Sequence, residues 1–273
     1  MLRCERVSLS HVASVARLSG REARARIRAG LWRRPTAGVA DGYVQANLVV
    51  VPEAVAGDFR EFCARNPGPC PVLEVMQPGS AEPVVVAPGA DVRVDLPRYR
   101  VYRDGSLADE IDTLVDLWQP DSVAFLLGCS FTFEAALVQA GVPLRHRELG
   151  CNVAMYRTAL ACEPVGPFRG PLVVSMRPVP RHLVGTAARV TGRFSRAHGA
   201  PVHVGDPAAL GISDLGAPDY GDVLAVRAGE VPVFWACGVS PQAALEAARL
   251  PLALTHAPGH MFITDLRDED LAD

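Results

Sequence analysis

The chain has 273 residues with 27 basic and 30 acidic side chains, which gives a net charge of −3 at pH 7. This balance argues against a nucleic-acid-binding protein, which normally carries a strongly basic face. Hydrophobic residues make up 49% of the chain and charged residues 21%, a composition that can bury a core. No apolar run reaches the roughly 20 residues that cross a bilayer, and the N-terminus is too charged for a signal peptide. We therefore expect a cytoplasmic protein without nucleic-acid or membrane partners, and leave a homo-oligomer open.

The cysteine and lysine counts limit the chemistry further. There are seven cysteines and no lysine. An odd number of cysteines in a chain without an export signal favours free thiols over a disulfide framework. No two of them form a CxxC pair, so the commonest zinc and redox motifs are absent. Without lysine, the protein cannot use a Schiff base or a lysine general base.

The first half of the chain alternates predicted helices and strands. A helix falls within Ser8–Trp32, with Ser19 as its N-cap and Gly30 past its end. The apolar, β-branched run Val44–Pro52 predicts a buried strand. Apolar spacing predicts two further helices, at Ala54–Arg65 and Leu107–Trp118. Short strands are predicted at Val72–Val75, Val84–Val86 and Leu96–Tyr102.

Two strand–turn–helix units are similar to each other in chemistry. In the first, the strand Val123–Leu127 runs into Gly128-Cys129-Ser130 and a helix at Phe131–Ala140. In the second, the strand Val231–Ala236 runs into Cys237-Gly238-Val239 and a helix that begins near Ser240. The remaining elements are four strands and a helix, at Leu172–Met176, Val202–Val204, Val223–Val226, Leu252–Thr255 and Arg181–His198.

The alternation of strands and helices predicts an α/β protein with a mainly parallel sheet covered on both faces. Residues 146–227 have more strand and turn signal than helix, which indicates a smaller α+β lobe. The larger lobe then consists of residues 20–145 together with 228–265. We treat residues 1–273 as one unit, because no flexible linker marks the edges of these lobes.

Ligands of open α/β sheets bind beyond the carboxyl ends of strands, so residues that follow buried strands are the first candidates. Cys129 and Cys237 both have this position, beside Gly128 and Gly238, which let a ligand approach the backbone. A nearby helix N-terminus would favour the thiolate form of each. Two such thiols are the arrangement of a cofactor-independent racemase, whereas buried structural cysteines would give the same sequence pattern.

Charged side chains occur at other strand ends. Arg157 and Arg177 each follow or end a predicted strand, where a guanidinium can bind a substrate carboxylate or form a structural ion pair. Glu134 lies one turn into the helix that follows Cys129. It can serve as a general acid or base, or simply interact with the helix dipole.

A third group lies nearer the C-terminus. Asp206 can be a base, but the N-cap of a helical turn is the favoured interpretation. His256 and His260 are four residues apart, yet the Pro-Gly pair between them disfavours a helix, so proton transfer by one imidazole is favoured over metal binding. No P-loop or GxGxxG motif is present. We therefore predict neither a metal nor an organic cofactor.

Nine sets of segments occur in order between residues 24 and 265: Tyr43–Leu48, Arg65–Pro67 with Cys70-Pro71, Asp95–Tyr102, Gly128–Phe131 with Phe133-Glu134, Asn152-Val153 with Met155–Thr158, Ser175–Pro178, His198–His203 with Gly205–Pro207, Pro232–Val239, and Thr255-His256 with Pro258–Met261. Together they resemble the hydro-lyase family that includes D-glutamate cyclases. Ala154 and Thr132 depart from the family pattern, and neither touches a proposed reactive atom.

The resemblance implies a three-layer α/β lobe with a smaller two-layer α+β lobe, and conversion of D-glutamate to 5-oxo-D-proline and water without an organic cofactor. In a hypothetical mechanism for this reaction, Arg177 and Arg157 hold the substrate carboxylate beside Ser130. Asp206 or His256 takes the amine proton, and Glu134 or His260 delivers a proton to the departing oxygen.

Backbone N–H groups after Gly128 and Gly238 would stabilise the oxyanion in this scheme. Cys129 could attack the γ-carbonyl to form a thioester, although direct attack by the amine is simpler. Two other hypotheses stay open. One is a racemase that uses Cys129 and Cys237, and the other is a non-catalytic protein that binds a small carboxylate.

Overall fold

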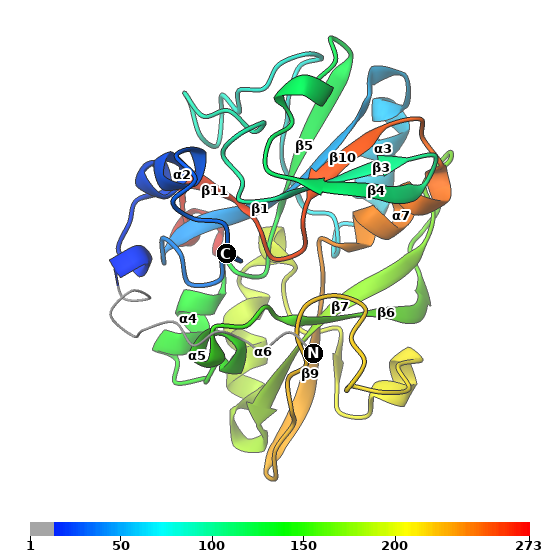
Figure 1. Cartoon of the computed structure of the whole chain (residues 1–273). Coiled ribbons are helices and arrows are strands. Elements are labelled where there is room, and N and C mark those ends of the chain that lie inside the picture. Colours follow the sequence, from blue (N-terminus) through cyan, green and yellow to red (C-terminus); the bar gives the residue numbers. More distant parts are fainter. Residues whose placement is uncertain (1–13) are drawn as a thin grey trace.

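The computed structural model describes residues 14–273, whose strands form two sheets (Figure 1). The first sheet has the order β2-β5-β1-β10-β3-β4, and β11 pairs with the first half of β1. Its strands are β1 (Tyr43–Pro52), β2 (Val72–Val75), β3 (Tyr99–Arg103), β4 (Ser106–Ile111), β5 (Ser122–Gly128), β10 (Ala253–His256) and β11 (Phe262–Arg267). The second sheet has the order β6-β7-β9-β8. It contains β6 (Ala154–Ala161), β7 (Pro171–Pro180), β8 (His203–Val204) and β9 (Glu230–Ala236).

The prediction of a mainly parallel sheet is wrong. Every pair of neighbouring strands in both sheets is antiparallel. The reason lies in strands such as β1 and β5, which are buried along nearly their whole length. A strand buried on both faces has a continuous apolar sequence, which is typical of parallel sheets. Here the same pattern arises because other elements cover both faces of an antiparallel sheet.

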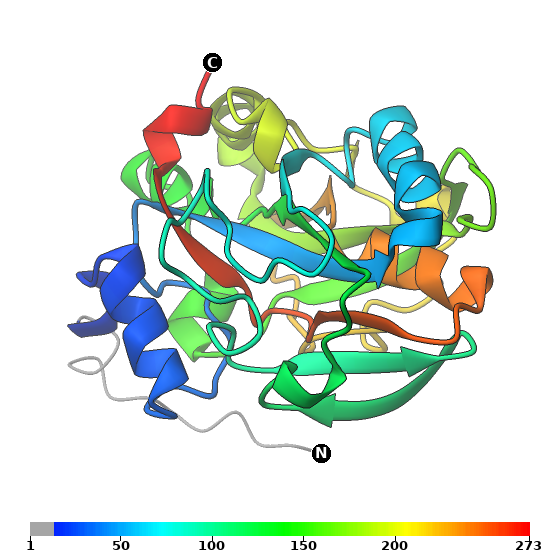
Figure 2. The ribbon, with the colours of Figure 1, turned by 90° about the horizontal axis from the view of Figure 1, so that it is seen from above.

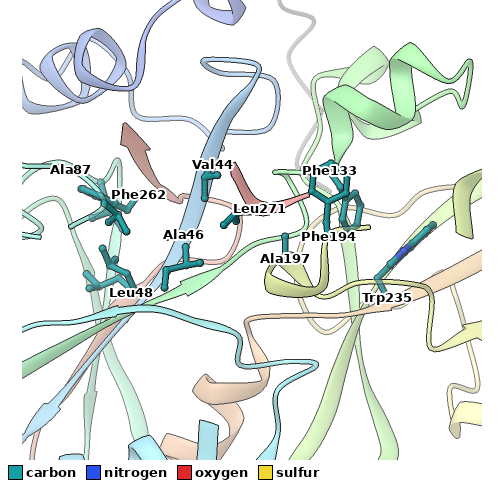
Figure 3. Packing of buried hydrophobic residues seen from close by; sticks show 14 of the residues in the cluster. Val44, Ala46, Leu48, Ala87, Phe133, Phe194, Ala197, Trp235, Phe262 and Leu271 are labelled. Atoms are coloured by element: carbon teal, nitrogen blue, oxygen red, sulfur yellow. The ribbon is translucent and has the colours of Figure 1, made fainter. Parts of the chain in front are cut away.

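The side chains of β1 alternate between two cores, as the period of a strand requires. One face contributes Val44, Ala46, Leu48 and Val50 to a core that also contains Phe133 and Trp235 (Figure 3). Because Trp235 belongs to β9, this core joins the two sheets. The other face contributes Val49 and Val51 to a second core. Gln45 and Asn47, which are also buried, share this second face.

Six α-helices of the described chain surround the sheets: α2 (Gly20–Arg28), α3 (Glu53–Arg65), α4 (Glu134–Gln139), α5 (Arg145–Leu149), α6 (Val184–Gly192) and α7 (Ser240–Ala248). Helix α2 packs on β11, α3 on β1 and β5, and α7 on β7. Figure 2 shows α2, in blue, at one end of the first sheet and α3, in cyan, and α7, in orange, at the other. The predicted N-cap Ser19 is confirmed, since its side chain and Glu22 form a reciprocal capping box.

The prediction of a helix at Leu107–Trp118 is wrong. Ser106–Ile111 form the largely exposed edge strand β4, and only a short 3-10 turn, η1 (Val115–Leu117), follows. Asp104 and Gly105, with φ of 50° and 81°, join β3 to β4. An Asp-Gly pair with both φ values positive is a strong signal for a two-residue hairpin turn, and it outweighs the helical spacing that follows.

Other predicted boundaries also change. Val84–Val86 form a turn, and Val223–Val226 form no strand. The helix predicted at Arg181–His198 is divided into the 3-10 turn η2 (Arg181–Leu183), α6 and the 3-10 turn η3 (Ser195–Ala197). Two further 3-10 turns are η4 (Pro207–Leu210) and η5 (Asp268–Leu271).

Strand β9, grouped by sequence with the larger lobe, pairs with β7 and β8 in the second sheet. The division of the chain into lobes stays a prediction. Within residues 14–273, no helix is both long and apolar enough to cross a membrane.

Candidate active site

Cys129 and Cys237 lie in one apolar cluster between the two sheets. Cys129 follows β5 of the first sheet and Cys237 follows β9 of the second, and the residues are 6% and 7% exposed. The other members of the cluster are Phe131, Val153, Met155, Val173, Val239, Ala243 and Met261, with Ala37 and Tyr220 at its partly buried edge. The fold therefore brings together two strand ends that are more than one hundred residues apart in the sequence.

The two sulfur atoms have matching surroundings. The backbone N–H of Phe131 donates to Cys129 Sγ at 3.5 Å, and that of Val239 donates to Cys237 Sγ. Burial nevertheless raises the pKa of Cys237 to about 11 and the pKa of Cys129 well above its ordinary value. Both thiols are therefore protonated at neutral pH. The expectation that a helix N-terminus would favour thiolates is corrected, because burial has the larger effect.

Asn47 of β1 lies against the turns that hold both thiols. Its Nδ2 atom donates to the carbonyl oxygen of Gly128 at 2.7 Å, and a Cβ at Gly238 would lie 2.0 Å from the same nitrogen. At Gly128, a Cβ would overlap the carbonyl oxygen of Arg196. Both glycines are therefore required by close packing of the protein itself, whether or not a ligand approaches them.

Arg177 is 1% exposed, and protein atoms occupy its donors. Its Nη2 atom donates to Glu134 Oε1 at 2.6 Å and to Ser130 Oγ at 3.0 Å, and its Nη1 atom donates to Ser175 Oγ at 3.1 Å. The guanidinium carbon lies 5.4 Å from the centre of the Trp235 ring. This arrangement favours a role for Arg177 in positioning Ser130 and Glu134 over direct capture of a substrate carboxylate.

Glu134 lies between the side chains of Arg177 and His146. His146 Nε2 lies 2.9 Å from Glu134 Oε1, although the angle is outside the range of a hydrogen bond. Burial opposes ionisation, but the charges of His146 and Arg177 lower the pKa of Glu134 to about 2. Its other oxygen, Oε2, is buried without a hydrogen-bond partner among the described residues. Glu134 is therefore an anion at neutral pH and is poorly suited to deliver a proton.

A second polar group lies at the Tyr220 edge of the thiol cluster. Arg157 donates to the Tyr220 hydroxyl at 2.6 Å and to both oxygens of Glu246 at 2.6 and 2.7 Å. The guanidinium carbon of Arg100, in β3 of the first sheet, lies 5.6 Å from the centre of the Tyr220 ring. The guanidinium carbon of Arg157, in β6 of the second sheet, lies at the same distance from that ring. Arg100 also donates to Glu110 at 2.7 Å. Two partly exposed cations thus converge on one aromatic ring.

His256 is fully buried within the first sheet. Its Nδ1 atom lies 3.2 Å from both the N–H and the carbonyl oxygen of Leu48, and burial lowers its pKa to about 3. Gln242 of α7 donates to the His256 carbonyl oxygen at 2.9 Å and accepts from the Tyr102 hydroxyl at 3.1 Å. A neutral, enclosed imidazole of this kind favours a positioning role for His256.

His260 is only partly buried and follows β10 by four residues. Its Nδ1 atom lies 3.1 Å from the carbonyl oxygen of Pro258. A carbonyl can only accept, so Nδ1 carries the proton and Nε2 keeps a lone pair. Burial lowers the pKa of His260, so the ring is neutral at pH 7. It is therefore the imidazole best suited to accept a proton.

Asp206 lies apart from these groups. It is exposed at the end of β8 and caps η4, accepting from the Ala208 N–H at 3.0 Å. Asp206 is therefore an N-cap, which is the interpretation that the sequence favours. No hydrogen bond or ion pair of the described chain joins it to either thiol, to Arg177 or to His260, and we leave it out of the proposed mechanism.

The structure offers no ready metal centre within residues 14–273, where no group of three or more His, Cys, Asp or Glu side chains is arranged around a common point. Free thiols are present at Cys63, Cys70, Cys129, Cys162 and Cys237. Cys151 is disulfide-bonded, which corrects the expectation of free thiols at that position.

Sequence reasoning missed several polar residues of the site. Gln45 and Asn47 are two residues apart in an otherwise apolar strand, a signal that one face of β1 meets polar groups at one end. His146 and Tyr220 gave no such signal, because they lie in a short helix and a loop whose burial depends on packing with distant segments.

The fold and the site together define the class of the protein. It is a mixed protein of helices and antiparallel sheets, with two thiols enclosed between the sheets. A profile of the family described as D-glutamate cyclase matches residues 123–265. A relative from Geobacillus kaustophilus, named "Putative hydro-lyase GK2103", is 59% identical over 256 residues, which cover 94% of this chain and 97% of the relative. A second, from Stutzerimonas stutzeri, is 60% identical over 254 residues, which cover 93% and 96%. The chain belongs to the D-glutamate cyclase family, which confirms the resemblance of its motifs.

Among solved structures, a nitrogen repressor-like protein from Methanococcus jannaschii is similar to this chain, with a TM-score of 0.40 and 11% identity over 94% of this chain and 98% of that chain.

Proposed function

We propose that this protein is a hydro-lyase that acts on a small amino acid and closes D-glutamate to 5-oxo-D-proline with release of water. Membership in the D-glutamate cyclase family and the hydro-lyase names of its relatives support the reaction class. The observation that carries the proposed site is the convergence of Cys129 and Cys237 on one buried cluster. The partly exposed cations Arg100 and Arg157 at its edge support an anionic substrate.

The reaction forms a bond between the amine nitrogen and the γ-carboxyl carbon and breaks one carbon–oxygen bond of that carboxyl. Two protons of the substrate ammonium leave with the oxygen as water, so atoms and charge balance without an added reactant. A carboxylate is a poor electrophile and hydroxide is a poor leaving group. The protein must therefore supply a base for the ammonium and an acid for the oxygen.

His260 is our candidate for the base. Its Nδ1–H is held by the Pro258 carbonyl oxygen, which leaves Nε2 free to take a proton from the substrate ammonium. Because burial lowers the pKa of His260, the neutral ring is available at pH 7. The freed amine then attacks the γ-carboxyl carbon directly, and one proton of the resulting ammonium passes to the carboxyl oxygen that will depart.

The thiols are our candidates for the acid. The pKa of Cys237, about 11, is far above neutrality yet well below that of water, so the thiol can protonate a departing hydroxide. The thiolate that results is neutralised by the proton which His260 carries. Since Cys129 is also protonated, we assign it a hydrogen bond to the γ-carboxyl oxygen and not a nucleophilic attack.

The substrate α-carboxylate is assigned to Arg157, which is about one-third exposed and whose Nη1 atom, unlike Nε and Nη2, makes no hydrogen bond among the described residues. Arg177 and Glu134 keep Ser130 in place beside Cys129. Serine could then orient the same carboxyl group that the thiols contact.

The proposal is tested by incubating the purified protein with D- or L-glutamate in deuterated water, followed by chiral mass spectrometry. We expect 5-oxo-D-proline without deuterium at Cα. Cys129→Ala and Cys237→Ala should each lower the rate by at least about 100-fold. Cys162→Ala is the matched control, because Cys162 is 6% exposed and burial raises its pKa to about 11, but it lies in another core cluster.

Two outcomes would overturn the proposal. Deuterium at Cα of recovered glutamate, lost in both thiol variants, would establish a racemase. Thermal stabilisation by D-glutamate without any turnover would establish a carboxylate-binding protein.

A further inference from the structure

A partly enclosed cavity of about 50 Å³ lies beside the Glu134–Arg177 network and is not used by the mechanism above. Since one water needs about 10 to 15 Å³ of such space, the cavity has room for a carboxylate group. Its polar lining comes mainly from Arg34, His146 and Arg147, and Trp32, Pro35 and Ala37 provide most of the apolar wall. Among residues 14–273, no acidic side chain lines it.

Three nitrogen atoms of the lining residues are buried without hydrogen-bond partners in residues 14–273, namely Arg147 Nη1 and both ring nitrogens of His146. His146 is 0% exposed. The other side of each group is engaged, since Arg147 Nη2 donates to Asp41 and His146 Nε2 lies 2.9 Å from Glu134 Oε1. Buried polar groups are almost always paired in folded proteins. Because the guanidinium N–H of Arg147 can only donate, its free position indicates a ligand that accepts hydrogen bonds.

Gly38 keeps the Arg147 guanidinium accessible. Its φ is +75°, and a Cβ at this position would lie 3.0 Å from Arg147 Nη2 and 3.1 Å from Nε. A side chain here would therefore be strained and would crowd the guanidinium. The loop that contains Gly38 thus forms one wall of a cavity that presents positive charge.

We infer that this cavity is a binding site for a carboxylate group, held by Arg147 Nη1 and His146 Nδ1. One oxygen of a planar carboxylate can accept from Arg147 Nη1, and the second can accept from His146 Nδ1 in the ring form that carries a proton there. The negative charge also balances the charges of Arg34 and Arg147 in the lining. The site lies apart from the Arg157 edge assigned to the substrate. Through His146 it contacts Glu134, and through Glu134 it contacts Arg177 and Ser130. An occupant would therefore set the orientation of the network beside Cys129.

The test measures binding of acetate, formate, glutarate and phosphate to the full chain by calorimetry, at constant ionic strength in chloride. We expect acetate and formate to bind more tightly than chloride. Arg147→Gln should weaken acetate binding about tenfold or more, the loss of one charge-assisted hydrogen bond. Arg145→Gln is the matched control, because Arg145 lies in the same helix and is ion-paired to Glu230, but it does not line the cavity.

A second measurement uses the unmodified protein, so it remains valid even if the Arg147→Gln variant does not fold. The ring ¹⁵N resonances of His146, assigned with His146→Gln, should move as acetate is added. The same titrations also distinguish two sources of the carboxylate, namely the substrate itself and a separate small acid. Competition between acetate and glutarate at this site would identify the substrate as a source, whereas acetate binding without competition would identify a separate small acid.

Three results would overturn the inference. These are acetate binding no tighter than chloride, acetate binding that Arg147→Gln leaves unchanged, and phosphate binding tighter than acetate with the same dependence on Arg147. The inference does not depend on turnover of D-glutamate. A failure of the proposed reaction with intact, Arg147-dependent acetate binding would leave this site standing.

Discussion

Arg177 donates from both Nη2 and Nε to a single oxygen of Glu134, at 2.6 and 3.1 Å, while the second carboxylate oxygen has no partner among the described residues. Both side chains are 1% exposed. The pair connects the first residue of α4, the helix that follows β5 and Cys129, with β7 of the second sheet. Such a pair is costly to break, because each charge is then left buried alone.

Arg177→Met should lower the free energy of unfolding by about 3 to 5 kcal/mol, since it removes both hydrogen bonds that the Glu134 carboxylate accepts from Arg177. Urea denaturation followed by circular dichroism measures this change. Arg157→Met is the matched control, because the Arg157–Glu246 pair is about one-third exposed and should contribute less than about 1 kcal/mol. Equal losses in the two variants would contradict the assignment of Arg177 as the buried link.

The acid stability of the protein should depend on Glu134. Its pKa is lowered to about 2 in the folded protein from an ordinary value of 4.5. The stabilisation is therefore complete above pH 4.5 and is lost as the pH falls toward 2, by about 3 kcal/mol in total. Glu134→Gln should remove this part of the acid dependence. Denaturation curves at pH 5 and pH 3 test this, and the same slope in both proteins would contradict it.

Asp268 should have the opposite effect to Glu134, because its contribution to stability decreases as the pH rises. Burial and the neighbouring Asp41 raise its pKa to about 7 from an ordinary value of 3.8. The folded protein then binds a proton that the unfolded chain has lost, so stability falls as the pH rises from 3.8 to 7 and stays low above 7. Asp268→Asn should raise stability at pH 8 by about 2 kcal/mol, allowing for partial exposure, and change little at pH 3.5. Thermal melts at the two pH values separate these outcomes.

The two site thiols should react slowly. Burial raises the pKa of Cys237 to about 11 and the pKa of Cys129 well above its ordinary value, and only the thiolate is nucleophilic. Iodoacetamide at pH 7.5 should therefore modify neither residue in the time that modifies a denatured sample. Peptide mass spectrometry measures the extent at each cysteine. Rapid modification of Cys129 in the native protein would show that it is ionised, and would revive the thioester mechanism.

The sequence was sufficient to find the two thiol turns because their signals are local. An apolar strand, a glycine and a cysteine follow one another at Val123–Cys129, and a similar unit occurs at Val231–Gly238. The direction of the strands was not predictable in this way, since a strand buried on both faces has the same apolar run in either direction. The antiparallel pairing of β1 with β10 joins residues about two hundred positions apart.

Local sequence patterns also could not predict the residues of the site whose positions depend on tertiary packing. His146 lies in the charged helix Arg145–Leu149, which has the composition of a surface segment, yet the residue is fully buried. Its contact with Glu134 arises only when α5 packs beside α4. In the same way, nothing in the sequence around Arg177 indicated that Glu134 and two serines would occupy its donors.

The assignment of His260 as base gives a final prediction. His260→Asn should lower kcat for D-glutamate closure by about 100-fold or more, since it removes the free Nε2 that accepts the ammonium proton. Because burial lowers the pKa of His260, the acidic limb of the pH–rate profile should lie below the ordinary histidine pKa of 6.5. His203→Asn is the control, because His203 bonds the carbonyl oxygen of Asp206 away from the thiols. Unchanged kcat in His260→Asn would remove this residue from the mechanism.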